Sequence, residues 1–344
     1  LRDVYKRQVL KQMERVDLES TDEIGRTPLH SAAKRGSLEM VRWLLQRKFS
    51  TKPDCYNETP LHLSASRVNK HSGEIAKLLM AQGFSADTMN KNGDTPLHIA
   101  AKSNNVDVAM VLIRRSIGTM EQRNKMEMLP IHVAAENGSV GVMKLLMSKG
   151  YNSKSTTINQ QNALHLAAMA QSVECIEIMI PFHIEEISKQ DGKGRTALAL
   201  TCLTRRDDTL ENQKKVANVV EALLKAGTDA SIEDEQGETG LMHALKNNNM
   251  EACLELMISK DAIKSKVSKV SNQTLLQMAI EHSQSAEDEM WQQLLPQMNV
   301  ELVNHQDNKG QTAMHLTVAK GWKAPTRVLI RKGGSLLITD NDGH

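Results

Sequence analysis

Aromatic residues are scarce in this chain: only 3% of its 344 residues are Phe, Tyr or Trp. A compact core of this size would normally use more aromatic side chains, so Leu, Ile, Val, Met and Ala must build the core. The scarcity also disfavours binding of single-stranded nucleic acid, which relies on bases stacking on aromatic rings. The formal net charge is only +2, so we expect no nucleic-acid partner.

Long apolar runs and paired cysteines are absent as well. No stretch of about 18 apolar residues occurs, which excludes a membrane span within this sequence. The four cysteines lie far apart, without a Cys-x-x-Cys motif: Cys55, Cys175, Cys202 and Cys253. This pattern favours buried thiols in a reducing compartment over a disulfide framework or a zinc site. We therefore expect a cytoplasmic chain, or the cytosolic part of a membrane protein, with no metal.

Catalytic signatures are also missing. The sequence contains no His-Glu-x-x-His, no Gly-x-Ser-x-Gly and no kinase motif. Residues 192–196 read Gly-Lys-Gly-Arg-Thr, but they lack the spacing of a Walker loop and the strand that precedes one. We expect no enzymatic activity, no cofactor and no small-molecule substrate.

What the sequence does contain is a repeat. Thr-Pro-Leu-His begins at Thr27, Thr59 and Thr95. Degenerate forms follow at 129–132, 162–165, 196–199, 239–242, 274–277 and 312–315. The successive spacings are 32, 36, 34, 33, 34, 43, 35 and 38 residues. Nine occurrences with a period of about 34 residues indicate a repeat architecture.

The residues around the motif repeat in the same register. An Asp/Asn-x-x-Gly turn precedes it, as at 22–25 and 90–93, and this turn uses an Asp or Asn side chain with a glycine of positive φ. Ala-Ala and a break follow it, and then a second apolar segment, as in Leu38, Val41 and Leu44. Each unit is thus predicted to be a turn, a short helix, a break and a longer helix.

The pattern resembles the ankyrin repeat, whose hallmark is Thr-Pro-Leu-His-x-Ala. The resemblance implies an all-α fold: a solenoid of stacked helix-turn-helix units with β-turn or hairpin fingers. It covers residues 9–344. The resemblance implies that the motif histidines form hydrogen bonds in the turns. A zinc site is excluded, because stacked units lie about 8–10 Å apart, whereas zinc needs ligands at about 2 Å. The motif histidines are His30, His62, His98, His132, His165 and His315.

The domain organisation follows from the repeat register. We expect residues 1–8 to be a non-native leader, because Leu-Arg-Asp-Val-Tyr-Lys-Arg-Gln lacks an initiator Met and resembles a mistranslated sequencing adapter. A partial repeat over 9–20, about nine repeats over 21–340 and the start of another at 341–344 would form one solenoid. Residues 204–215 lengthen the longest interval, and their mixed charge predicts a solvated loop, which is either a tolerated insertion or a protrusion that contacts a partner. Shorter insertions lie at 68–72 and 287–296.

The resemblance implies a non-catalytic scaffold or adaptor that binds proteins through a concave face and finger tips. On the concave side, the first three repeats place a basic strip consisting of Lys34, Arg35, Arg67 and Lys102. This strip is either a solvated face or a docking site for an acidic peptide.

Apolar side chains near the fingers are the second predicted contact surface. Tyr56 and Ile158 occupy finger tips. Met126 and Met128 flank position 127, where a finger usually has glycine, and Met169 falls on the concave side. Exposed apolar groups in a row indicate an interface, unless the loops fold inward and pack locally.

Two other assignments are open at this point. The array resembles equally well the cytosolic ankyrin region of a transient-receptor-potential-type ion channel, or a targeting module of a larger enzyme. Because fold does not determine function, the partner protein is not identified by the sequence.

Overall fold

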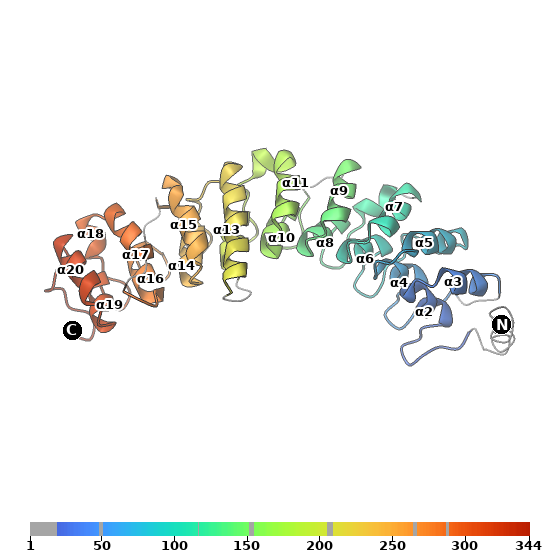
Figure 1. The fold of residues 1–344 in the computed structure, drawn as a ribbon, viewed down its shortest axis with the longest axis horizontal. Coiled ribbons are helices and arrows are strands. Elements are labelled where there is room, and N and C mark those ends of the chain that lie inside the picture. The colour runs from blue at the N-terminus through green and yellow to red at the C-terminus, as the bar shows by residue number, and fades with distance from the viewer. Residues whose placement is uncertain are drawn as a thin grey trace, which may run out of the picture. The chain divides into compact units, whose positions relative to one another are not determined.

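A computed structural model describes residues 19–47, 51–115, 117–150, 155–204, 209–263, 267–286 and 289–344 (Figure 1). The predicted leader at 1–8 and residues 9–18 of the predicted partial repeat lie outside the described residues. Contacts divide the chain into two compact units, Leu1–Ile158 and Asn159–His344, which are described separately. The prediction of one continuous solenoid stays a prediction.

Unit 1 holds repeats one to four, each with two antiparallel helices. The first helices are α2 (Pro28–Arg35), α4 (Pro60–Ala65), α6 (Pro96–Lys102) and α8 (Pro130–Glu136). The second helices are α3 (Leu38–Leu45), α5 (Ser72–Ala81), α7 (Val106–Arg115) and α9 (Val140–Ser148), with a 3-10 turn η1 (Ile117–Glu121) after α7. First helices pack on first helices and second on second, so the unit is a two-layer stack.

Unit 2 holds repeats five to nine and repeats the same arrangement. The first helices are α10 (Ala163–Ala170), α12 (Ala197–Leu203), α14 (Gly240–Lys246), α16 (Leu275–His282) and α19 (Ala313–Ala319). The second helices are α11 (Val173–His183), α13 (Leu210–Lys225), α15 (Met250–Ile258), α17 (Glu289–Leu294) and α20 (Lys323–Arg331). Second helices are followed by short helical segments, namely the 3-10 helices η2 (Ile184–Glu186), η3 (Lys260–Ile263) and η4 (Leu295–Gln297) and the short α-helix α18 (Val300–Val303).

The motif explains how each first helix begins and packs. In repeat three, Thr95 is the extended N-terminal cap and Pro96 occupies the first turn, where its missing N–H costs no hydrogen bond. Leu97, Ala100 and Ala101 have no exposed surface, so leucine fills the core while the alanines allow close helix packing. The predicted all-α repeat fold is confirmed.

The fingers are turns rather than extended hairpins. Among the described residues no strand forms, and the single isolated bridge joins Val267 to Thr274. Backbone hydrogen bonds between neighbouring fingers take the place of a ladder.

The predicted loop at 204–215 is wrong for its second half. Leu210 begins α13, which has 16 residues. The Thr209 hydroxyl accepts a hydrogen bond from the N–H of Asn212 at 3.3 Å, and Lys215 pairs with Glu211 at 2.8 Å. A cap and an i,i+4 ion pair thus convert the charged insertion into extra helix. Residues 205–208 lie outside the described parts.

Within the described ranges, every helix is too short or too polar to cross a bilayer.

Candidate functional site

The finger tips of unit 1 are shaped by one side chain per finger. In repeat two, Oδ1 of Asp54 accepts hydrogen bonds from the N–H groups of Tyr56 at 2.9 Å and Glu58 at 2.8 Å. In repeat four, Oδ1 of Asn124 accepts them from Met126 and Met128, both at 3.0 Å. These bonds fix the tip before any partner arrives, so binding through it loses little conformational freedom.

Hydrogen bonds from finger to finger join the tips into a row. The Cys55 N–H donates to the carbonyl oxygen of Ile24 at 2.8 Å, and the Lys91 N–H donates to that of Tyr56 at 2.8 Å. Further along, the Ile158 N–H donates to the carbonyl oxygen of Met126 at 3.5 Å. The fingers of unit 1 are therefore neighbours in space although they are more than thirty residues apart in sequence.

Three of the predicted tip residues are exposed in this row. The exposed fractions are 51% for Tyr56, 55% for Met126 and 64% for Ile158. Sequence reasoning missed two exposed members, Cys55 and Met89. Cys55 stands beside Tyr56 at the tip, so the register of the repeat contained the signal for it. Together these side chains form the fingertip row: Cys55, Tyr56, Met89, Met126 and Ile158.

Met128 does not belong to the fingertip row, and its predicted exposure is wrong. Only 6% of the residue is exposed. Its carbonyl oxygen accepts a hydrogen bond from Nε2 of His98 at 3.0 Å, so it lies at the base of the finger, where the preceding repeat packs. Met169 belongs to unit 2 and is half-buried. Its sulfur accepts a weak hydrogen bond from the Gln161 amide at 3.6 Å.

The predicted basic strip lies along the C-terminal ends of the first helices of unit 1. Its members are all exposed, and none forms an ion pair with the described residues: Lys34, Arg35, Arg67 and Lys102. Neighbouring repeats are tied together here, because the Ser103 hydroxyl donates to the carbonyl oxygen of Ala65 at 2.5 Å and the Asn105 amide donates to that of Arg67 at 3.1 Å. These bonds join repeats two and three at the strip, which ends where Glu136 takes the position of Lys102.

The motif histidines are hydrogen-bonding links between repeats. In repeat three, Nδ1 of His98 accepts the N–H of Thr95 at 3.1 Å, and its Nε2 donates to the carbonyl oxygen of Met128 at 3.0 Å. This bonding requires the neutral ring with its proton on Nε2. The same two bonds recur at His30, His62, His132, His165 and His315.

Burial opposes protonation of five of these histidines, His30, His62, His98, His132 and His165. Desolvation is the largest cause, and it lowers the pKa of His62 and of His132 to about 4. The pKa values of His30, His98 and His165 are lowered for the same reason. A second proton would also place an N–H on Nδ1 against a backbone N–H. These rings are therefore structural groups rather than proton carriers at neutral pH.

Among the residues that the structure describes, one group of side chains has the composition of a metal site. Ligand atoms of Asp340, Asp342 and His344 lie within 4.8 Å of one another. However, Oδ1 of Asp340 already accepts the N–H groups of Asp342 at 3.1 Å and His344 at 2.9 Å, just as Oδ1 of Asp307 accepts two N–H groups in the preceding finger. The finger turn accounts for this arrangement.

Comparison with known proteins agrees with the geometry. A family model described as ankyrin repeats, in three copies, matches residues 4–71, 63–157, 132–212 and 210–302. Mouse inversin is 34% identical over 113 residues, which are 32% of this chain and 10% of that protein. The human transient receptor potential cation channel subfamily A member 1 is 26% identical over 170 residues, 48% of this chain and 15% of the channel protein.

A third relative is an enzyme. The rat 85/88 kDa calcium-independent phospholipase A2 is 30% identical over 92 residues, 26% of this chain and 11% of the enzyme. The chain thus spans a small part of these relatives. Ankyrin repeats are non-catalytic protein-interaction modules, and the family model covers most of the sequence. The chain belongs to the ankyrin-repeat family.

Proposed function

We propose that this chain is a protein-binding scaffold that recognises a partner protein through the fingertip row of unit 1. The observation that carries the proposal is the exposure of Tyr56, Met126 and Ile158 on turns that are hydrogen-bonded to one another. Apolar side chains held on a rigid edge can be buried by a partner at low entropic cost.

The basic strip supports the same function by a different force. Unpaired cations at Lys34, Arg35 and Lys102 attract an acidic segment and speed its association. Apolar tips would then supply most of the affinity, because exposed charges contribute little once salt screens them.

The test is a comparison of two triple variants of the full chain. Tyr56→Ser, Met126→Ser and Ile158→Ser together remove the apolar tips of unit 1. The matched control, Lys193→Ser, Gln236→Ser and Lys309→Ser, changes exposed tips of unit 2. Partners are captured from a cell lysate and quantified by mass spectrometry. The first variant should capture at least about tenfold less partner protein than the unmodified chain, and the control should capture the same amount. Equal capture by both variants would contradict the proposal.

A second candidate function is the cytosolic ankyrin region of an ion channel. It is favoured by the 170 aligned residues shared with the human channel, the longest of the three alignments above. In that setting the same fingertip row would bind another part of the channel or a regulatory protein. Patch-clamp recording of a channel that carries the triple fingertip variant would test it, with altered gating as the expected result.

Targeting of a larger enzyme is the third candidate, favoured by the alignment with the rat phospholipase. All three candidates place this chain in the cytoplasm and give it no catalytic role of its own. They are distinguished by sequencing the native transcript: apolar spans of about 20 residues select the channel, and a catalytic motif selects the enzyme.

A further inference from the structure

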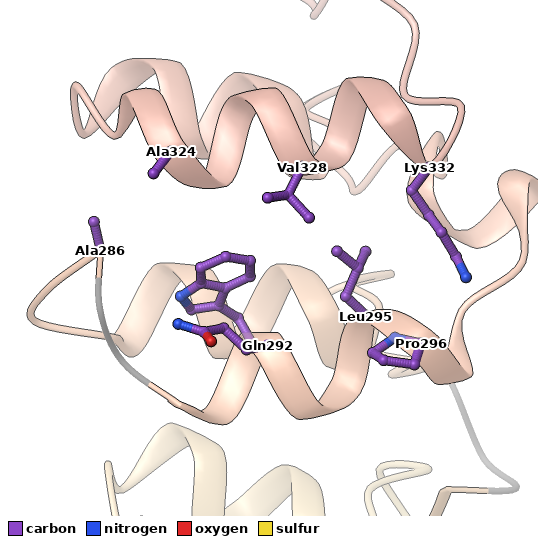
Figure 2. Close-up of a pocket in the computed structure, with 8 residues that line it drawn as sticks. Ala286, Gln292, Leu295, Pro296, Ala324, Val328 and Lys332 are labelled. Carbon is purple, nitrogen blue, oxygen red and sulfur yellow. The ribbon is translucent and has the colours of Figure 1, made fainter.

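A groove lies in unit 2, between the second helices of repeats eight and nine. It has a volume of about 550 Å³, and α17, η4 and α20 form its walls. Figure 2 shows Ala324 and Val328 on α20, and Lys332 directly after it, facing Leu295 and Pro296 across the groove. Apart from Lys332 and Gln292, the lining residues are apolar. The volume of the groove is in the size range of ligand-binding clefts.

The groove is held open at both ends of α20. Before the helix, the Lys320 ammonium donates hydrogen bonds to the carbonyl oxygens of Glu281 at 2.9 Å and Ser283 at 2.7 Å. After the helix, the Asn304 amide donates to the carbonyl oxygen of Gly333 at 2.9 Å. Because these bonds anchor α20 to repeat eight, the space between the helices is a formed feature of the fold.

An unpaired hydrogen-bond donor accompanies the groove. Trp291 lines it and is 4% exposed, and its Nε1–H has no acceptor among the residues that the structure describes. A buried donor without a partner is costly, so such a group is rare in native proteins. It is also one of only three tryptophans in the chain.

Positive charge flanks the groove along α20. Lys323, Arg327 and Arg331 follow one another at intervals of four, so they form one stripe beside the lining residues Ala324 and Val328. All three cations are exposed, and none forms an ion pair with another described residue. With Lys332 at one end, the groove presents an apolar floor beside a cationic edge.

We propose that this groove binds an amphipathic helix of a partner protein, with its apolar face against Trp291 and Val328 and its acidic residues against the stripe on α20. Two walls that are themselves short helices suit a ligand helix of about three turns, whose anchors repeat at i, i+4 and i+7. This interface lies in unit 2 and shares no residue with the fingertip row of unit 1, so it is a second binding surface.

The experiment uses the full chain with Trp43→Phe and Trp322→Phe, which leaves Trp291 as its only tryptophan. The probe is a synthetic peptide of about three helical turns with Leu at i, i+4 and i+7 and Glu beside each Leu. A second peptide carries Gln in place of every Glu. Titration followed by Trp291 fluorescence should saturate, with the Glu peptide binding about tenfold tighter than the Gln peptide at low salt.

Two variants locate the site. Lys323→Glu, Arg327→Glu and Arg331→Glu together should weaken the Glu peptide about tenfold or more, and Val328→Glu should abolish binding by filling the groove with charge. The matched control reverses three exposed cations on second helices of unit 1, Lys77, Arg115 and Lys144, and should leave the affinity unchanged. All these side chains are exposed, so circular dichroism should show unaltered folding.

Three results would overturn the proposal. One is the absence of any saturable change in Trp291 fluorescence with the Glu peptide. Another is peptide binding that neither the triple reversal nor Val328→Glu weakens. The third is a response to dodecanoate or to phosphatidylserine vesicles without a response to the peptide. Loss of lysate partners from the fingertip variant, with peptide binding intact, would separate this interface from the proposed function.

Discussion

Repeats three and eight solve one structural problem with different side chains. In repeat three, His98 accepts the N–H of Thr95 and donates to the carbonyl oxygen of Met128. In repeat eight, Oε1 of Gln277 accepts the N–H of Thr274 at 2.7 Å. Its Nε2 donates to the carbonyl oxygens of His305 at 3.1 Å and Gln311 at 2.6 Å. The position therefore needs one acceptor and one donor, and an imidazole is only one way to provide them.

The finger tips differ between the units in a similar way. Asp54 and Asp234 form the same turn, yet Tyr56 stands at the tip in unit 1 and Gln236 at the tip in unit 2. The backbone is the same while the exposed chemistry is not. Architecture is thus set by the residues that bond the turn, and recognition is set by the residues that the turn presents.

The largest expected effect is a loss of stability at acidic pH in the repeats that carry the motif histidine, which repeat eight with Gln277 should not show. His62 and His132 have folded pKa values of about 4, below the unfolded value of 6.5, so the unfolded chain binds more protons in this range. Their stabilising contribution is complete above pH 6.5 and is lost as the pH falls toward 4. At pH 5 the loss is about 2 kcal/mol for each histidine.

Urea unfolding at pH 7 and pH 5 checks this prediction. The double variant His62→Gln and His132→Gln, which copies the bonding of Gln277, should recover about 4 kcal/mol of the acid loss. An unchanged pH dependence in the double variant would show that these rings are not the titrating groups.

The next effect concerns His98 alone. His98→Ala should lower the free energy of unfolding by about 3 kcal/mol, because it leaves the Thr95 N–H and the Met128 carbonyl unpaired in a buried place. His98→Gln should cost less than about 1 kcal/mol, since Gln277 makes the equivalent bonds. Thermal and urea unfolding of both variants measure the two losses of stability. Equal losses would show that glutamine cannot replace the hydrogen bonds of His98.

A smaller effect is expected at the finger glycine of repeat three. Gly93 has a φ of +78°, and an added Cβ would lie 2.8 Å from the backbone nitrogen of Lys125. Gly93→Ala should therefore cost about 2 kcal/mol through backbone strain and steric conflict with the next finger. Unfolding measurements that show no loss would mean that the fingers are not packed together as described.

The smallest effect is the reverse substitution in the next finger. Glu127 occupies the same position as Gly93 and has a φ of +56°. Glu127→Gly should stabilise the chain by up to about 1 kcal/mol, because the left-handed backbone strains a residue with a Cβ. Its ion pair with Arg123 at 3.7 Å is exposed and contributes little. A destabilised variant would show that the glutamate makes a stronger contact than this one.

Much of this structure followed from the sequence, because it depends on local chemistry. A Thr-Pro start and an Asp or Asn turn act within a few residues, so the helices, the fingers and the bonding role of His98 were predicted correctly. Burial of Met128 was not predicted, since it depends on how the base of the finger packs against the preceding repeat. The groove beside Trp291 was also missed, because it arises from the spacing of two helices in different repeats.

Recognition through the fingertip row is the central claim, and one cross-linking measurement tests it most directly. A photoreactive benzoylphenylalanine replaces Tyr56 in one sample and Lys193, the exposed tip residue of a unit 2 finger, in another. After irradiation in a cell lysate, the probe at position 56 should cross-link to a partner protein, and the probe at 193 should not. Cross-linking of the same partner at 193 alone, or equally at both positions, would contradict the account.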